Sequence, residues 1–119
     1  MASTDSFDVT TFQHLLAVGR LSEAAEQVRQ SLTQAPEDPD LLHAASIVCV
    51  QSGRLAEAAE WIGRALARRP DSPEFLNSRG AVAYGLGRME EAEAAFRQAL
   101  TLAPRDAVAW NNLGNTLKS

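Results

Sequence analysis

The chain has 119 residues, of which 45% are hydrophobic and 6% are aromatic, and it carries a formal net charge of −4. This length fits one domain, and the acidic balance argues against a nucleic-acid partner, which normally selects a basic protein face. No apolar run could span a bilayer and no secretory signal is visible, so we expect a cytoplasmic protein without membrane contact.

Two helices are predicted before the first proline, Pro36, at residues 6–18 and 21–34. In the second of them, apolar and small residues recur at three- and four-residue intervals, the spacing of one helical face. Phe12, in the first helix, stands where later copies of this helix have Ser46, Gly80 and Gly114. We expect either a shifted register at this position or room for the ring because no earlier helix pair packs there.

Four further helices are predicted, at residues 39–52, 55–68, 73–86 and 89–102. Asp38 and Ser72 can cap the N-termini of two of them, and Pro39 and Pro73 fit the first helical position. The linkers between the helices have two to four residues, which makes neighbouring helices antiparallel. No alternating pattern typical of a strand occurs in the chain.

The last predicted helix covers residues 107–118 and follows a capping residue, Asp106. Its apolar residues Trp110, Leu113 and Leu117 lie at helical spacing. We expect them to cover the end of the preceding helices and to leave an open end. Two explanations compete for this end. Either the chain is a fragment of a longer repeat array, which we favour, or the end pairs with another copy and is the candidate contact surface for a homo-oligomer.

The helices recur in pairs with a period of 34 residues, in copies that start at Gly19, Gly53 and Gly87. A fixed period of this length is typical of a repeat architecture. Ala92 and its equivalents are small, which lets a partner helix approach closely. The other positions that are identical in all three copies are Arg20/Arg54/Arg88, Glu23/Glu57/Glu91, Leu32/Leu66/Leu100 and Pro36/Pro70/Pro104.

The spacing of these residues resembles the tetratricopeptide repeat (TPR), a helix–turn–helix unit of 34 residues. With the proline of each copy set at place 32, the third copy has Leu76, Gly80, Ala92, Phe96, Ala99 and Pro104 at places 4, 8, 20, 24, 27 and 32. The resemblance implies an all-α fold, a right-handed α-solenoid of antiparallel helix pairs with seven helices. It also implies one domain over residues 1–119, with repeats at about 5–38, 39–72 and 73–106 and a partial repeat at 107–119.

In TPR proteins the first helix of each repeat lines a concave groove that binds a protein or peptide. The resemblance therefore predicts a protein–protein interaction scaffold. Apolar groove residues can hold side chains of the partner, and amide groups can bond its backbone. The predicted groove residues are Gln13, His43, Ile47, Val50, Asn77, Tyr84, Asn111 and Asn115.

One subclass of TPR domains grips the C-terminal carboxylate of heat-shock chaperones with cationic and amide side chains at defined places. In this sequence those places hold Val9, Gln13, Ala44, Glu74 and Ser78. None of the five is a cation, and Glu74 would repel a carboxylate. We therefore do not expect this chain to bind a chaperone in that way.

The sequence offers no set of residues for catalysis, a cofactor or a metal ion. Cys49 stands at a core place of its repeat and is expected to be a buried thiol without a neighbouring base. His14 and His43 are 29 residues apart and form no metal-binding set. Trp61 faces the side opposite the groove and is expected to lie over the adjacent helix. We expect a protein that is not an enzyme.

Two other functions remain open at this stage. Residues 109–118 look like the repeats that precede glycosyltransferase domains of the O-linked N-acetylglucosamine transferase type, so the chain could be the N-terminal arm of a larger enzyme. Those arms carry an asparagine ladder at place 6, which only Asn112 matches. The other alternative is a self-associating assembly module joined through Trp110, Leu113 and Leu117.

Overall fold

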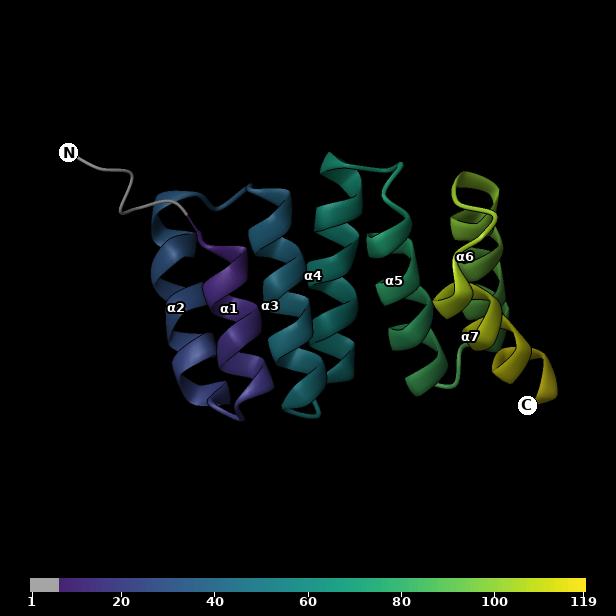
Figure 1. Ribbon diagram of the computed structural model, residues 1–119, viewed down its shortest axis with the longest axis horizontal. Coiled ribbons are helices and arrows are strands. Elements are labelled where there is room, and N and C mark those ends of the chain that lie inside the picture. Colours follow the sequence, from purple (N-terminus) through teal and green to yellow (C-terminus); the bar gives the residue numbers. More distant parts are fainter. Residues whose placement is uncertain (1–6) are drawn as a thin grey trace.

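The computed structural model describes residues 7–119, which form seven α-helices and no strand. Helices alternate in direction and stack side by side into a row, with α1 lying in front of α2 and α7 in front of α6 (Figure 1). The molecule measures 49 × 26 × 23 Å along its principal axes. The helices are α1 (Val9–Ala17), α2 (Leu21–Gln34), α3 (Pro39–Gln51), α4 (Leu55–Arg68), α5 (Pro73–Gly85), α6 (Met89–Leu102) and α7 (Ala107–Lys118).

Capping residues set where four of the helices begin. The side chains of Asp38, Ser72 and Asp106 accept hydrogen bonds from backbone N–H groups in the first turns of α3, α5 and α7. Asp8 does the same for Thr10. Because Asp8 is the N-cap, α1 begins at Val9, later than the predicted start at residue 6.

Glycines close the short turns inside each helix pair. Gly19, Gly53 and Gly87 have φ angles of 80°, 78° and 80°, in the left-handed region that residues with a Cβ rarely adopt. Each one follows the first helix of its pair and lets the chain reverse within three residues. This conformation explains why glycine recurs at this place in every copy.

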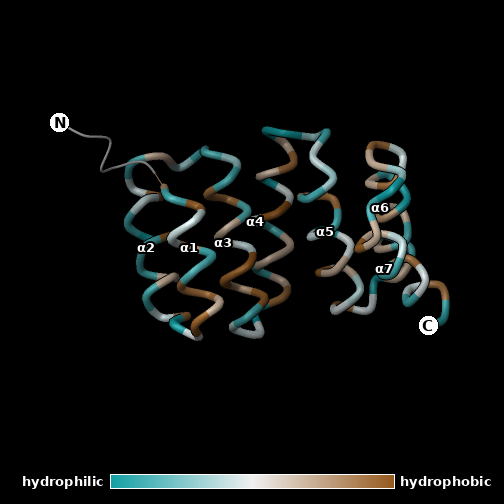
Figure 2. The backbone as a smooth tube through the Cα atoms, viewed as in Figure 1, coloured by the Kyte–Doolittle hydropathy of each residue, from teal (hydrophilic) through white to brown (hydrophobic). Residues whose placement is uncertain are grey.

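The core runs through the row in clusters shared by neighbouring helices. Small residues lie at the closest helix contacts: Ala24, Ala58 and Ala92 are each fully buried. Eight residues of α3 are buried, whereas α2 at the end of the row buries two. Figure 2 shows the same contrast, with α2 largely hydrophilic and α3 carrying long hydrophobic stretches. The prediction of an all-α solenoid of antiparallel pairs is confirmed.

Phe12 fits into this core because the residue at the facing place of α2 is smaller than the equivalent residue of the third repeat. The ring is 2% exposed and packs in one cluster with Val28 of α2. In the third repeat the equivalent pair is Gly80 with Phe96, whose ring lies against the glycine backbone. The space between the two helices is therefore filled from the first helix in one repeat and from the second helix in the other.

Candidate functional site

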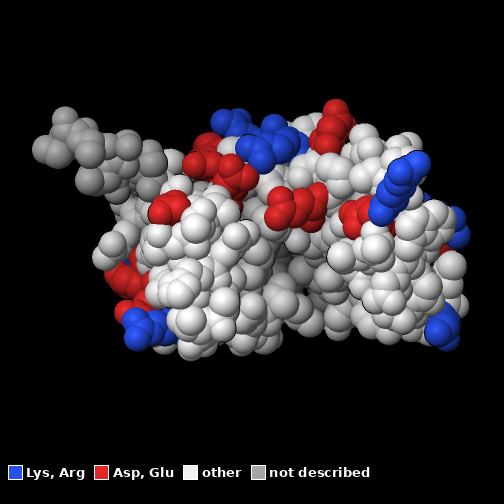
Figure 3. Space-filling view, in the orientation of Figure 1, with Lys and Arg blue, Asp and Glu red and all other residues white. Residues whose placement is uncertain are grey.

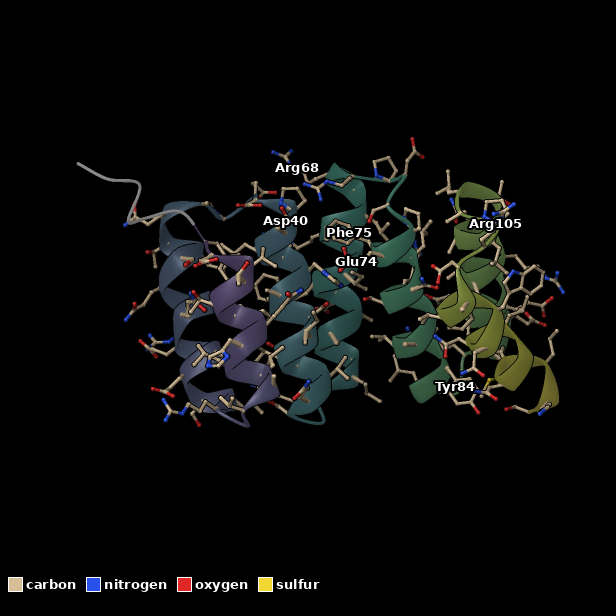
Figure 4. The ribbon with its side chains drawn as sticks, viewed as in Figure 1. Asp40, Arg68, Glu74, Phe75, Tyr84 and Arg105 are labelled. Atoms are coloured by element: carbon tan, nitrogen blue, oxygen red, sulfur yellow. The ribbon has the colours of Figure 1, made fainter. Side chains whose placement is uncertain are left out.

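The odd-numbered helices share one face of the molecule, and two pockets lie along it. The first pocket, of about 70 Å³, lies between α1 and α3, and the second, of about 140 Å³, lies between α5 and α7. Figure 4 shows Asp40 and Glu74 beside each other over α3 and α5, with Tyr84 near the lower end of α5. We call this face the groove face.

The first pocket combines apolar walls with two acids. Its apolar residues come mainly from α1 and α3, and Asp40 and Glu74 stand at its edge. The Asp40 carboxylate also accepts a hydrogen bond of 2.9 Å from Arg69, whereas Glu74 is exposed. The full lining is Phe7, Val9, Phe12, Gln13, Leu16, Asp40, His43, Ala44, Ile47 and Glu74.

His43 belongs to the lining of the first pocket and is bonded within the protein. It is 8% exposed, its Nε2 lies 2.7 Å from Ser78 Oγ, and its ring lies 4.7 Å from that of Phe75. Burial lowers the pKa of His43, and the charges of Glu74 and Asp40 oppose this shift to a smaller extent. His43 therefore acts as a neutral bridge between α3 and α5, and the predicted free hydrogen-bonding group is not available at this nitrogen.

The second pocket is lined by two of the predicted groove residues, Tyr84 and Asn115. The Tyr84 hydroxyl is 3.1 Å from Ser119 Oγ, and its side chain is 38% exposed. Phe96 of α6 forms the floor, and Ala81 and Asn112 complete the wall. This pocket offers an aromatic edge beside two amide groups, which suits a short apolar side chain and a backbone group next to it.

Three predicted groove residues line neither pocket. Asn77 donates from Nδ2 to Asp106 Oδ2 at 2.7 Å, and this bond holds the pKa of Asp106 below its usual range, with help from the backbone N–H of Ala109. Val50 and Asn111 are exposed. Sequence reasoning placed Asn111 in the groove, whereas the structure places its neighbour Asn112 in the second pocket.

Charges on the groove face are arranged in a band. In Figure 3 acidic and basic side chains lie together across the upper part of this face, and a wide uncharged area lies below them. Asp40 and Glu74 belong to this band, and Arg68 lies above them at the edge of the molecule (Figure 4). Arg64 and Arg68 lie 3.5 Å and 3.9 Å from Glu37, and Arg69 lies 2.9 Å from Asp40, so arginines partly compensate the acids at this edge.

The opposite side of the row carries two wider hollows, of about 350 and 400 Å³. Trp61 lies in the second of these, half-buried over neighbouring helices and with the Arg64 guanidinium 4.9 Å from its ring centre. Cys49 is buried beneath it, and burial raises the pKa of its thiol. Trp61 and Cys49 thus lie as the sequence predicted, as a packing residue and a buried thiol.

The predicted open end at α7 is only partly open. Leu113 is 3% exposed and belongs to the same core cluster as Phe96, so it is not available for a contact between copies. Trp110 and Leu117 point outward and are 56% and 55% exposed. The correction follows from helix geometry, because α7 turns Leu113 toward α6 while the other two face away.

Within residues 7–119, no three His, Cys, Asp or Glu side chains lie close enough together to hold a metal ion. Over the same residues, no helix combines the length and hydrophobicity needed to cross a membrane.

Comparison with family models gives one consistent family. A model described as Tetratricopeptide repeat matches residues 15–81, more than half of the chain, and a second model with the same description matches residues 62–107 and 79–117. A search of curated proteins found no match.

Solved structures of similar shape are TPR domains or proteins that contain related folds. The first TPR of Spaghetti (RPAP3), bound to the HSP90 peptide SRMEEVD, superposes with a TM-score of 0.84 at 21% identity, over 92% of this chain and 86% of that one. The second TPR domain of human RPAP3, in complex with the HSP70 peptide SGPTIEEVD, gives 0.82 at 18% identity over 92% of each chain. Pseudomonas aeruginosa pilF gives 0.82 at 26% identity, over 91% of this chain and 50% of that one.

Proposed function

Because the chain belongs to the tetratricopeptide repeat family, we propose that it is a non-catalytic scaffold that binds an extended peptide segment of a protein partner on the groove face. The observation that supports this proposal most strongly is the pair of pockets on one face, at the α1–α3 and α5–α7 contacts. Two side chains of an extended peptide can enter the two pockets while its backbone crosses the His43–Ser78 bridge between them.

The charge of the groove face narrows the class of peptide. The peptides bound to the two RPAP3 domains end in EEVD and are acidic. In this chain the charged side chains at the first pocket are Asp40 and Glu74, and His43 is held neutral by burial. We propose that the groove rejects an EEVD terminus and accepts a peptide with an apolar residue for one pocket and a lysine or arginine beside Glu74.

A heptapeptide display selection on the full chain tests both parts of this proposal. We expect selected peptides to contain lysine or arginine more often than aspartate or glutamate, and SRMEEVD to remain unbound. Their affinity should fall at least tenfold in Tyr84→Ala, which removes the aromatic edge of the second pocket, and basic peptides should also weaken in Glu74→Gln. The matched control is Glu60→Gln, which lies in one of the hollows on the opposite side.

The outcomes separate the two parts. Peptides that bind Tyr84→Ala and Glu74→Gln as tightly as the wild type would contradict the groove assignment, and so would a selection that yields no peptide. Peptides that lose affinity in Tyr84→Ala but show no basic preference would contradict the charge argument alone.

The cytoplasmic location and the role as an arm of a larger glycosyltransferase-like enzyme stay predictions. Asn112, the residue that matches the asparagine ladder, lines the second pocket next to Asn115, which is where a peptide backbone would pass. The second pocket therefore fits peptide binding whether the chain is a separate scaffold or an arm of a larger enzyme. The display selection would yield the same peptide in both cases.

A further inference from the structure

The side of the row opposite the groove face carries the same hollow twice. The α2–α4 hollow, of about 400 Å³, lies over α3, and the α4–α6 hollow, of about 350 Å³, lies over α5. In each case the two outer helices pack on the helix between them and not closely on each other, which leaves the space open. Most lining positions of one hollow recur in the other, one repeat later in the chain. The differences between the two hollows therefore show what makes each one distinct.

The first difference is an arginine that the α4–α6 hollow lacks. In the α2–α4 hollow, Glu26 forms an ion pair with Arg29, which lies three residues further along α2. The equivalent residues of the α4–α6 hollow are Glu60 and Gly63, although the third copy again has an arginine, Arg97, at this place. An added Cβ at Gly63 would meet nothing within 4 Å. Glu60 is exposed and forms no ion pair with any residue from 7 to 119.

The second difference leaves an arginine of the α4–α6 hollow without its acid. In the second copy, Arg54 pairs with Glu57 at 3.8 Å. The equivalent glutamate of the third copy, Glu91, lies 3.6 Å from Arg79 of α5 instead. Arg88, which stands at the place of Arg54, is exposed and has no ion-pair partner in the described part of the chain.

Both unpaired charges thus line one hollow, on different helices and around an apolar floor. Glu60 stands on α4 and Arg88 at the start of α6, and the lining residues Ile62, Val82 and Ala83 are at most 3% exposed. A single exposed ion pair adds little to affinity. Two pairs of opposite sign, formed by one ligand over an apolar surface, also fix its orientation and disfavour ligands with the reverse order of charges.

We propose that the α4–α6 hollow binds a segment of a partner protein that carries a basic and an acidic side chain on the same face, with an apolar residue between them. The basic side chain lies over Gly63, takes the place of the missing arginine and pairs with Glu60. The acidic side chain pairs with Arg88, and the apolar residue packs on the floor. This site lies on the side opposite the groove face, and it does not depend on the groove proposal.

The experiment is a selection of displayed random peptides on the full chain carrying Tyr84→Ala. This substitution alters the groove face and lies outside the α4–α6 hollow. Peptides that also bind the Gly63→Arg chain are removed. The Gly63→Arg side chain should pair with Glu60, as Arg29 pairs with Glu26, and should occupy the open space. Because arginine forms helices more readily than glycine, we expect this variant to fold, and its thermal unfolding checks this.

We expect the selected peptides to carry one basic and one acidic residue. Their affinity should fall at least tenfold in Gly63→Arg and should also fall in Glu60→Gln and in Arg88→Gln. Gly114→Arg is the matched control, since Gly114 is also a helical glycine with open space around it and lies outside the hollow. This control should bind the peptides as tightly as the wild type.

An exchange of charges gives the sharpest readout. A chain with both Glu60→Arg and Arg88→Glu should reject a selected peptide and bind the same peptide after its acid and its base have been exchanged. An effect of these residues on helix stability alone would not produce this recovery.

Three results would overturn the proposal. One is a selection that yields no peptide sensitive to Gly63→Arg, and another is a set of peptides without the charge pair or without recovery after the exchange. The third is a dimer of the protein alone, seen by sedimentation equilibrium, that dissociates in Gly63→Arg, because the occupant would then be a second copy. Peptides of the groove face are recognised by their loss of affinity in Tyr84→Ala, so the groove proposal is tested separately.

Discussion

The first and third repeats fill the same space between their two helices from opposite sides. In the first repeat the large residue is Phe12 on α1 and its partner on α2 is Val28; in the third, Gly80 on α5 faces Phe96 on α6. Both aromatic rings are at most 2% exposed. The comparison teaches that the pair of positions is constrained by its summed volume, as expected for a close-packed interior, whereas neither position alone is constrained.

The strongest test of this idea is Gly80→Phe, which places two rings in a space that holds one. We expect a loss of about 3 kcal/mol or more in the free energy of unfolding, at or beyond the upper end of overpacking costs. Adding Phe96→Val should recover a large part of the loss, because the double variant then has the arrangement of the first repeat. Chemical denaturation of the two single variants and the double variant gives the coupling energy.

The control for this cycle is Gly114→Phe, the same substitution at a glycine of α7 where an added Cβ would meet nothing within 4 Å. It should leave the stability within about 0.5 kcal/mol of the wild type, because helix propensity favours phenylalanine slightly over glycine and no atom is displaced. Additive effects of Gly80→Phe and Phe96→Val would show that the two repeats are not alternative solutions of one packing problem.

A second test asks whether the same deletion matters equally at the end and in the middle of the row. Phe12→Ala and Phe96→Ala each remove a buried ring. In a core that unfolds as one unit, such a change lowers the free energy of unfolding by about 3–5 kcal/mol. We expect the full effect for Phe96, which belongs to the cluster shared by α3 to α7. For Phe12 we expect a smaller change in global stability and selective opening of α1 and α2, because terminal repeats contact a neighbour on one side only.

Hydrogen exchange read helix by helix distinguishes the two variants. Faster exchange confined to α1 and α2 in Phe12→Ala, with protection of α5 and α6 unchanged, supports this view. If Phe12→Ala also accelerates exchange in α5 and α6, the row unfolds as a single unit and the distinction between its regions is wrong.

The sequence predicted the fold better than the groove, and the reason lies in the range of the interactions. Helices, caps and turns depend on residues close in sequence, such as Asp38 before Pro39 or Gly53 in its turn, and the 34-residue period then determines how the pairs stack. The group that a polar side chain bonds depends instead on how closely the stacked repeats bring the two groups together. Sequence alone did not indicate that His43 would bond Ser78 or that Asn77 would bond Asp106.

The end of the row shows the same limit. The helical spacing of Trp110, Leu113 and Leu117 correctly predicted an apolar α7, but it could not separate the side facing α6 from the side facing away. The spacing of the repeat does not contain this information either. The place of Leu113 holds the buried Ala45 in the second repeat but the exposed Arg79 in the third. The places of Trp110 and Leu117 are buried in both of these repeats, so their exposure in α7 depends on which helices pack there.

The smallest predicted effect concerns the middle of the row, where His43 joins the second repeat to the third. Burial lowers its pKa below the ordinary value of about 6.5, so below that pH the unfolded chain takes up a proton that the folded chain does not. The free energy of unfolding should therefore fall as the pH drops through 6.5 and level off below the folded-state pKa. Thermal unfolding between pH 8 and 5 measures this slope.

His43→Gln should remove the slope in this pH range, although its stability at pH 8 will be lower because the contacts with Ser78 and Phe75 are disturbed. His14→Gln is the matched substitution, since His14 is exposed on α1, and its unfolding is measured over the same pH range. A slope that persists in His43→Gln would assign the titration to another group. A stability that rises as the pH drops would mean that the folded state prefers the charged imidazole, so that the attraction of Glu74 and Asp40 outweighs the cost of burial at this joint.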